Sequence, residues 1–211
     1  MNFYNAQLAF EYYYDYILKK GVDFANTKAL FNIGFTILNP KDNIINTKWR
    51  NFSSKYAERE WQWYLKGDPN AEEISNYAPI WKSMMDENGN VRSNYGWQWN
   101  RNDQLTKVIN KLRNNKNTRQ ATISIYDGKE IDTYSKDTPC TYAVQFSIWQ
   151  NELHMSVLMR SNDLWYGFCN DQYCFSNLHI LVADKLNLSL GTYYHYAHNL
   201  HLYNNFLNKK Q

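Results

Sequence analysis

A succession of strand-like segments in the second half of the chain constrains the fold more than any other feature of the sequence. Residues 121–126 (ATISIY), 141–149 (TYAVQFSIW) and 153–160 (LHMSVLMR) are rich in β-branched and aromatic residues, and a Gln-Asn-Glu turn joins the last two. Residues 28–38 and 191–203 predict two further strands.

Helical patterns stand among these strands without a regular alternation. Helices are predicted at residues 5–20, ending at Gly21, at residues 53–66, with Trp61, Tyr64 and Leu65 on the apolar side, and at residues 172–186. The clearest helix begins at Asn102-Asp103 and carries apolar residues at helical spacing, namely Leu105, Val108, Ile109 and Leu112. This mixture predicts an α+β fold around one large sheet.

Length, charge and cysteine content narrow the classes of function. A chain of 211 residues is expected to form one domain over residues 1–211, and a net charge of +3 is too small to predict a nucleic-acid groove. No run approaches the roughly 18 apolar residues of a membrane helix, and the first residues lack a secretory pattern. Three irregularly spaced cysteines do not form a disulfide framework, so we expect a cytoplasmic protein without membrane or nucleic-acid partners.

Cys140, in the run DTPC (137–140), is the candidate nucleophile. A lone cysteine near strands is usually a small buried apolar residue, and Cys169 and Cys174 are interpreted in that way. Pro139 fixes the backbone just before a strand, which can expose the thiol of Cys140 at the strand end. Arg160, at the end of the partner strand of the hairpin, is placed to approach this thiol and lower its pKa.

Glu60 and three histidines are the other candidates for chemistry. Glu60 stands beside tryptophans, and apolar surroundings raise a carboxyl pKa toward the range of proton transfer, although a solvated helix residue is the plainer interpretation. His195 and His201 share one face of a predicted strand and His198 points to the other, with no acidic or thiol partner at ligand spacing. No metal site is predicted.

Six blocks, in order, resemble the thymidylate synthase superfamily. They are EWQWYLKGD (60–68), IWKSMMDENGNVRSNYGWQW (80–99), NTRQA (117–121), DTPC (137–140), MRSND (159–163) and HYAHNLHLY (195–203). The resemblance implies a thymidylate synthase-like fold and a homodimer joined sheet to sheet. It also implies a transferase that moves a one-carbon unit from the co-substrate 5,10-methylenetetrahydrofolate to carbon 5 of a pyrimidine nucleotide, without a metal.

The matched blocks assign roles to particular residues. The resemblance implies that Cys140 adds to carbon 6 of the base and that Glu60 transfers protons through ordered water. Phosphate is expected at Arg160 and Ser161, with Arg119 arriving from the second subunit. His201 and Tyr203 match residues that bind the sugar hydroxyl, and the positions that line the folate side and the water network are matched by Trp81, Tyr95 and Asp163.

Within the superfamily, the strongest likeness is to deoxycytidylate hydroxymethylases such as those encoded by bacteriophages, which implies the host cytoplasm. Eleven residues beyond Arg160, synthases that use uracil have Asn and these hydroxymethylases have Asp; this chain has Asp171. A carboxylate accepts hydrogen bonds from the amine of cytosine and repels the carbonyl of uracil, and a mismatched buried polar group costs about 1–3 kcal/mol. We therefore expect dCMP 5-hydroxymethylation, in which water attacks the exocyclic methylene.

Three departures from the family pattern leave alternatives open. Gln120 replaces the second Arg of the pair that crosses the dimer. The family's N-terminal phosphate-binding loop is absent, and Lys28, about where that loop should stand, is expected to bind phosphate in its place. The chain is also expected to lack the family's C-terminal folate lid. The alternatives are thymidylate synthase or dUMP hydroxymethylase activity, a catalytically impaired nucleotide-binding homologue, and transfer of some other group to carbon 5.

Overall fold

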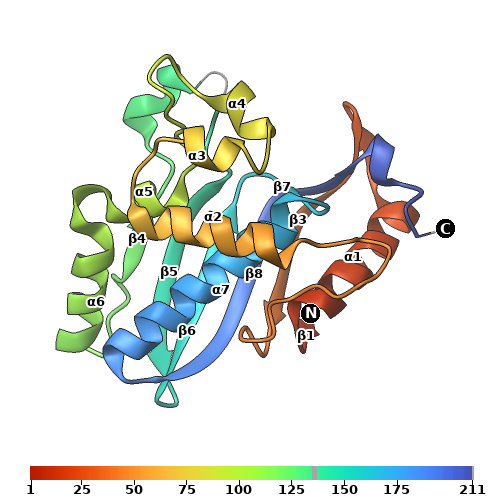
Figure 1. Ribbon diagram of the computed structural model, residues 1–211. Coiled ribbons are helices and arrows are strands. Elements are labelled where there is room, and N and C mark those ends of the chain that lie inside the picture. Colours follow the sequence, from red (N-terminus) through yellow and green to blue (C-terminus); the bar gives the residue numbers. More distant parts are fainter. Residues whose placement is uncertain (135–136, 211) are drawn as a thin grey trace.

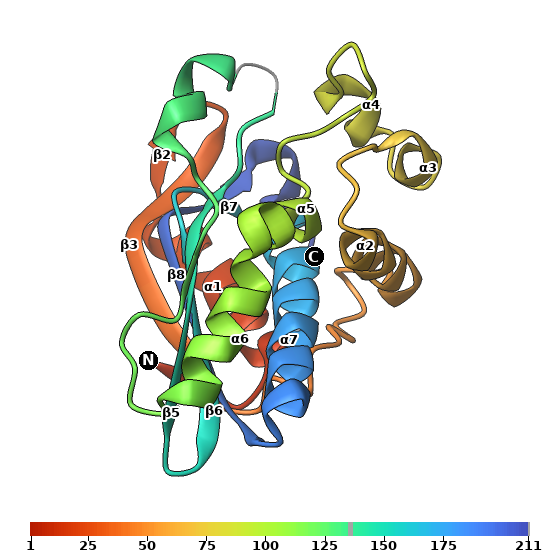
Figure 2. The ribbon, with the colours of Figure 1, turned by 90° about the vertical axis from the view of Figure 1, so that its left-hand side faces the viewer.

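The computed structural model describes residues 1–134 and 137–210 and consists of one mixed sheet with helices on one side (Figures 1 and 2). The strands are β1 (Asn2–Phe3), β2 (Val22–Phe24), β3 (Thr27–Ile37), β4 (Thr122–Ser124), β5 (Thr141–Trp149), β6 (Glu152–Met159), β7 (Asn162–Asp163) and β8 (Ser189–Tyr203). The α-helices are α1 (Ala6–Lys20), α2 (Ser54–Lys66), α3 (Glu72–Ser75), α4 (Ile80–Met84), α5 (Tyr95–Asn100), α6 (Gln104–Asn114) and α7 (Gly167–Leu186). Three 3-10 turns are η1 (Arg101–Asp103), η2 (Gly128–Thr133) and η3 (Asn204–Phe206).

The strand order is β1-β3-β8-β6-β5-β4, with β2 paired to β3 and β7 paired to β8. β8 runs antiparallel to β3 but parallel to β6 and β7, so the sheet is mixed. The predicted α+β architecture with one large sheet and flanking helices is confirmed. The pairing of β7 with β8 sets Asp163 opposite His201 and so brings two of the sequence blocks together.

The core lies between the sheet and the helices α1, α6 and α7, which Figure 2 shows on one side of the sheet. Side chains alternate between the two faces of a strand, so Tyr193, His195 and Ala197 of β8 all face the helices and are buried. Val157 of β6 is in register with His195 and is buried on the same face. α2 packs against α7 on the far side from the sheet, and this second helical layer brings Glu60 toward the strand ends.

The first helix ends where the sequence predicts, although for a different reason. α1 begins after Asn5, whose side chain accepts a hydrogen bond from the backbone N–H of Leu8 at 3.0 Å. Gly21 ends it with a φ of −64°, so the glycine is not in the left-handed conformation of the usual C-terminal cap. A Cβ at this position would lie 2.6 Å from the carbonyl oxygen of Ile17. Close approach of the backbone therefore explains the glycine.

One side-chain prediction on α2 is wrong. Leu65 was expected on the apolar face but is 43% exposed, whereas Trp63 is 6% exposed. Trp63 packs edge-on against Trp81 and donates its indole N–H to the carbonyl of Asn70 at 2.7 Å. α2 is therefore covered on two sides, which a single apolar stripe does not predict.

Element boundaries also differ from the sequence predictions. α7 begins at Gly167, several residues before 172, because the carboxylate of Asp163 accepts hydrogen bonds from the first backbone N–H groups of the helix. The helix expected from Asn102-Asp103 starts at Gln104, after η1. β4 is shorter than the predicted strand at 121–126. Among residues 1–134 and 137–210, each helix is too short or too polar to cross a lipid bilayer.

Candidate active site

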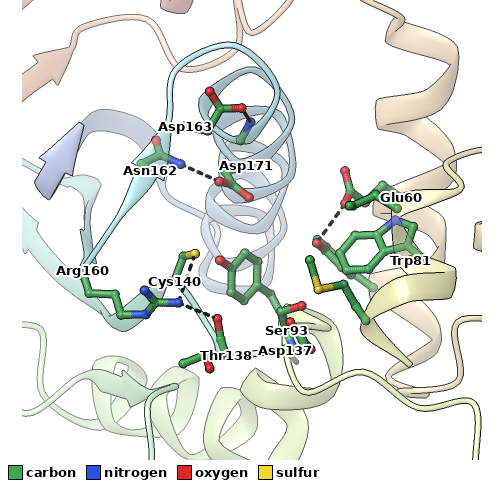
Figure 3. A pocket seen from close by; sticks show the side chains of 15 residues that line it. Glu60, Trp81, Ser93, Asp137, Thr138, Cys140, Arg160, Asn162, Asp163 and Asp171 are labelled. Carbon is green, nitrogen blue, oxygen red and sulfur yellow. Dashed lines mark hydrogen bonds between the residues drawn. The ribbon is translucent and has the colours of Figure 1, made fainter. Parts of the chain in front are cut away.

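A cavity of about 350 Å³ opens where the start of β5 and the end of β6 meet α2, α4, α5 and α7 (Figure 3). Helices α2, α4, α5 and α7, strand β7 and the segments just before β5 and just after β6 contribute its lining, namely Glu60, Tyr64, Ile80, Trp81, Met84, Ser93, Tyr95, Asp137, Thr138, Cys140, Arg160, Asn162, Asp163, Gly167 and Asp171. Seven residues predicted to belong to the site therefore face one space, although six of them come from four different sequence blocks and the seventh, Asp171, lies outside the blocks.

Cys140 and Arg160 are neighbours across the β5–β6 hairpin. The backbone N–H of Arg160 donates to the carbonyl of Cys140 at 2.7 Å, which fixes the two residues side by side. The Arg160 guanidinium also donates to the carbonyls of Pro139 at 3.0 Å and Thr138 at 2.9 Å. Its Nη2 atom lies 3.7 Å from the Cys140 sulfur. The expected approach of the cation to the thiol is confirmed.

The expected lowering of the Cys140 pKa by Arg160, however, is wrong as a net effect. Burial raises the pKa of Cys140 to about 11, and the nearby carboxyl groups of Asp171 and Asp137 raise it further while Arg160 opposes the rise. The charged thiolate loses its hydration in the cavity, and one partly exposed guanidinium does not compensate for that loss. Cys169 and Cys174 are fully buried and also have raised pKa values, in agreement with their interpretation as structural residues.

Glu60 lies on α2 with only 5% of its surface exposed. The hydroxyl of Tyr64, one turn later, donates to Oε1 at 3.2 Å, and in the described part of the chain Oε2 has no hydrogen-bond partner. Burial raises the pKa of Glu60 to about 7, despite the opposing hydrogen bonds from Tyr64 and Tyr56. The expected rise of this pKa toward neutral pH is therefore found, whereas proton transfer by Glu60 stays a prediction.

Asp171 lies in the second turn of α7 and is held by one side-chain hydrogen bond. Nδ2 of Asn162 donates to its Oδ2 atom at 2.8 Å (Figure 3). Burial raises the pKa of Asp171 well above its usual range, and the charge of Glu60 adds to the rise while the bond from Asn162 opposes it. A charge on Glu60 therefore favours the neutral form of Asp171.

Asp163 has a structural task as well as a place in the cavity. It accepts hydrogen bonds from the backbone N–H groups of Trp165 at 3.0 Å, Tyr166 at 2.8 Å and Gly167 at 3.4 Å, and so caps the start of α7. These bonds and His201 lower its pKa, but burial is the larger effect and the net pKa is raised. Any substitution of Asp163 will thus also affect the helix that carries Asp171.

Five predicted residues lie outside the cavity lining. His201 and Tyr203 are close to it, because β8 pairs with β7 and places His201 beside Asp163. The rings of His201 and Tyr203 meet at right angles, with 5.2 Å between their centroids. Ser161 connects β6 to β7, and Lys28 pairs with Leu202 on the neighbouring strand. Arg119 is exposed in the segment between α6 and β4, away from this cavity.

Eight of the fifteen lining residues were not predicted from the sequence, and three of these eight have side chains that make polar contacts in the site. Asn162 holds Asp171, and Asp137 accepts a hydrogen bond from the backbone N–H of Ser93 at 2.7 Å. Tyr64 contacts Glu60. Asn162 and Asp137 stand inside the quoted blocks MRSND and DTPC, so the signal was present, but nothing in one sequence tells which polar residues of a block face inward. Among the described residues, no group of three His, Cys, Asp or Glu side chains is placed to hold a metal ion.

Comparisons with known proteins identify the family of this chain. A family model described as thymidylate synthase matches residues 18–211. A deoxyuridylate hydroxymethyltransferase of Pseudomonas phage M6 is 29% identical over 178 residues, which cover 82% of this chain and 51% of the relative. The chain thus spans about half the length of that phage protein.

Bacterial relatives match over a larger share of their length. The thymidylate synthase of Wigglesworthia glossinidia brevipalpis is 30% identical over 208 residues, covering 92% of this chain and 78% of the relative. That of Bacillus mojavensis is 27% identical over 188 residues, covering 85% and 67%. The chain therefore belongs to the thymidylate synthase family, whose members transfer a one-carbon unit from methylenetetrahydrofolate to carbon 5 of a pyrimidine nucleotide.

Proposed function

We propose that this protein hydroxymethylates carbon 5 of dCMP, with methylenetetrahydrofolate as the one-carbon donor and water as the second reactant. One observation carries the choice of base: the residue placed to read it is a carboxyl group, Asp171, with one oxygen held by Asn162 and the side chain facing the cavity. An ionised carboxyl accepts from the exocyclic amine of cytosine. The same group repels the carbonyl oxygen that uracil carries at that position.

The covalent step begins at Cys140. Its thiolate adds to carbon 6 of the ring, forming a sulfur–carbon bond and making carbon 5 nucleophilic. Carbon 5 bonds to the one-carbon unit and loses its proton, and tetrahydrofolate departs to leave an exocyclic methylene. Water adds to that methylene, and release of the thiolate from carbon 6 restores the aromatic ring. The proposal implies the reducing cytoplasm, which keeps Cys140 as a free thiol.

Glu60 is the proposed proton carrier, with Tyr95 in the same water network. A carboxyl group with a pKa of about 7 can both give and take a proton near neutral pH. The folate donor supplies the one-carbon unit when bound. Ile80, Trp81 and Met84 form an apolar wall of the cavity that fits a flat ring, and Trp81 is fixed by donating its indole N–H to Tyr56 at 2.9 Å. Asp163 completes the folate side.

Arg160 and Ser161 are proposed to hold the nucleotide phosphate, assisted by Lys28 and by Arg119 of the partner subunit. Arg160 already uses Nε and Nη2 on backbone carbonyls, and its Nη1 amine has two further N–H donors. His201 and Tyr203, beside β7, are proposed to bind the sugar hydroxyl. Four carboxyl groups line the same cavity, so several cations around the phosphate are expected to be needed to hold a dianion there.

The test is a mass spectrum of dCMP and of dUMP after separate incubations with the protein, methylenetetrahydrofolate and buffer. We expect dCMP to gain the mass of one CH2O unit while dUMP stays unchanged, and Asp171→Asn to shift turnover toward dUMP. Turnover of dUMP alone by the wild-type protein refutes the proposed base choice.

A uracil nucleotide is the second candidate, and two observations favour it. The phage relative is a deoxyuridylate hydroxymethyltransferase by name, and the bacterial relatives are thymidylate synthases. Burial also raises the pKa of Asp171, and a protonated carboxyl group carries an O–H that can donate to the uracil carbonyl. A methyl rather than a hydroxymethyl product in the same incubations identifies synthase activity.

A nucleotide-binding homologue without turnover is the third candidate. The raised pKa of Cys140 favours it, because the thiol form is a poor nucleophile. Exchange of the carbon-5 hydrogen of dCMP or dUMP into solvent distinguishes the two cases, since exchange requires the covalent adduct. We expect exchange with the wild-type protein and none with Cys140→Ala; equal behaviour of the two proteins refutes the catalytic proposal.

A further inference from the structure

A chain of buried polar groups runs from the central strand of the sheet to the cavity. The hydroxyl of Tyr193 lies 2.9 Å from Nδ1 of His195, and Nε2 of His195 lies 3.1 Å from Oδ1 of Asn162. Nδ2 of Asn162 then lies 2.8 Å from Oδ2 of Asp171. Tyr193 and His195 are fully buried and Asn162 is 2% exposed, so bulk water does not compete for these bonds.

The direction of each hydrogen bond follows from the chemistry at the Tyr193 end. Within the described residues, His195 is the one hydrogen-bond partner of the Tyr193 hydroxyl. A buried hydroxyl that only accepted there would leave its own proton unsatisfied, which costs about 1–3 kcal/mol. Tyr193 therefore donates, and Nδ1 of His195 accepts.

The position of the proton on the His195 ring sets the direction of the next hydrogen bond. Burial lowers the pKa of His195 to about 3, so the ring is neutral and carries a single N–H. With Nδ1 accepting, the proton is on Nε2 and is donated to Oδ1 of Asn162. The amide of Asn162 is thereby oriented with its NH2 group toward Asp171, which agrees with the donor at Nδ2.

We propose that Tyr193, His195 and Asn162 act as a positioning relay that decides which oxygen of Asp171 reads the base, an inference that rests on the proposed function. Oδ2 is held as an acceptor by Asn162, and Figure 3 shows the other oxygen directed into the cavity. Any proton on the carboxyl group must then be on Oδ1. This oxygen is an acceptor for an amine when Asp171 is ionised and a donor to a carbonyl when it is protonated.

The other tautomer of His195 would reverse the hydrogen bonds of the relay and give Asp171 a different protonation pattern. If Nδ1 of His195 carried the proton, Asn162 would turn its carbonyl toward Oδ2 of Asp171. The carboxyl group would then have to be protonated on Oδ2, and the oxygen in the cavity would be an acceptor only. The hydroxyl of Tyr193 is what disfavours this state, although it touches neither Asp171 nor the cavity.

Other groups around Asp171 also set its charge state. The charges of Glu60 on α2 and Asp163 on β7 act on it. The charge of Asp171 in turn acts on six groups of the packed elements, namely Tyr64 of α2, Tyr95 of α5, Cys140 before β5, Cys169 and Cys174 of α7 and Tyr193 of β8. None of these donates a side-chain hydrogen bond to Asp171; that contact comes from Asn162. Loss of the Asn162 donor is therefore expected to raise the pKa of Asp171 further.

The tautomer of His195 can be measured directly, without substrate. In nitrogen-15 histidine spectra of the nucleotide-free protein, we expect His195 to stay neutral between pH 5 and 9 with its proton on Nε2. His179 provides an internal standard, because its Nε2 lies 2.7 Å from the backbone carbonyl of Leu153, which can only accept. A His195 signal of the Nδ1–H form, or of the charged ring, overturns the proposal.

Activity measurements test the function of the relay. We compare Asn162→Leu, which removes the donor, and Tyr193→Phe, which removes the hydroxyl that fixes the tautomer. The control is Tyr14→Phe, because Tyr14 is equally buried and its hydroxyl donates to the carbonyl of Phe206 instead. For Asn162→Leu, the acid limb of kcat/KM for dCMP is expected to move about one pH unit higher. At pH values below the limb, kcat/KM should then be about tenfold lower than in the wild-type protein.

Tyr193→Phe is expected to move the limb in the same direction by a smaller amount, and Tyr14→Phe is expected to leave it in place. A limb that is the same in Tyr193→Phe and Tyr14→Phe overturns the relay beyond Asn162, because a purely structural role affects both tyrosines alike. If the protein converts dUMP but not dCMP, the proposed function fails while the His195 tautomer still tests the relay itself.

Discussion

At the scale of single residues, loss of hydration dominates the chemistry of the cavity. Glu60, Asp137, Asp163 and Asp171 all have raised pKa values with burial as the largest cause, and the same holds for the thiol of Cys140. One guanidinium, from Arg160, faces these groups from within the cavity. The cavity therefore favours neutral side chains, and the thiol of Cys140 must lose its proton against that preference.

The reactivity of Cys140 toward an alkylating agent follows from this balance. Because its pKa is raised to about 11, the rate of modification by iodoacetamide should keep rising with pH well above neutrality. Cys169 and Cys174 are buried and should stay unmodified in the folded protein. Peptide mass spectrometry after timed alkylation from pH 7 to 11 measures this profile.

Removal of the guanidinium in Arg160→Met should slow this alkylation of Cys140 further at each pH, because Arg160 is the group that favours the thiolate. A Cys140 rate that levels off near pH 8 in the wild-type protein would show that Arg160 outweighs burial.

The variant Glu60→Gln is expected to change stability and activity in opposite directions. The folded-state pKa of Glu60, about 7, lies above its ordinary value of 4.5, so ionising Glu60 costs the folded protein stability as pH rises from 4.5 to 7. Gln cannot ionise, and the variant should gain up to about 3 kcal/mol over the wild type above pH 7 and nothing near pH 4. Turnover should fall by about 10²–10⁴ if Glu60 transfers protons.

Urea unfolding of this variant at pH 4 and pH 8 checks the stability gain. Glu58→Gln serves as the matched control, because it makes the same exchange on the exposed side of α2. A Glu60→Gln protein that is less stable than wild type at pH 8 contradicts the burial argument.

At the scale of elements, the periodic patterns of the sequence predicted most helices and strands. The features that these patterns did not predict depend on contacts between elements. The long strands β3, β5, β6 and β8 agree closely with their predictions because each alternates or is buried along its length. The start of α7 and the exposure of Leu65 could not be read locally, since they depend on the Asp163 cap and on packing of α4 against α2. In the site, matched blocks identified residues, and only the fold showed which of them face the cavity.

The packing of α5 on α2 places Tyr95 in the cavity and depends on one glycine. A Cβ at Gly96 would lie 1.8 Å from the backbone carbonyl oxygen of Tyr64. Ala is intrinsically better than Gly in a helix by about 1 kcal/mol, but a clash with backbone cannot be relieved by a rotamer change. Gly96→Ala should therefore destabilise the protein by about 3 kcal/mol, or move α5 away from α2 far enough to displace Tyr95.

Gly128→Ala is the control for this prediction, because a Cβ at Gly128 meets no atom within 4 Å. The two variants differ only in where one methyl group is placed, and their urea midpoints give the comparison. Equal midpoints would show that α5 can shift away from α2 without loss of stability.

At the scale of the whole molecule, the sheet has one face against the helices and one without a helix over it in the described residues (Figure 2). Tyr194, Tyr196 and Leu158 lie on that second face, and Tyr194 is 38% exposed. The segment between α6 and β4, which carries Arg119, runs along the same side of the molecule. This arrangement supports the proposed sheet-to-sheet dimer, in which Arg119 serves the neighbouring cavity.

The dimer proposal predicts complementation between two inactive variants. Cys140→Ala lacks the nucleophile, and Arg119→Glu deprives the neighbouring site of its phosphate contact, so each homodimer should be inactive. After mixing and subunit exchange, half of the dimers are mixed and each contains one complete site, which predicts about a quarter of wild-type activity. Arg113→Glu, an exposed arginine of α6 outside the proposed contact, should be active alone. If mixing restores nothing while sedimentation shows a dimer, Arg119 does not cross the interface; a monomer at working concentration removes the proposal that two chains share each site.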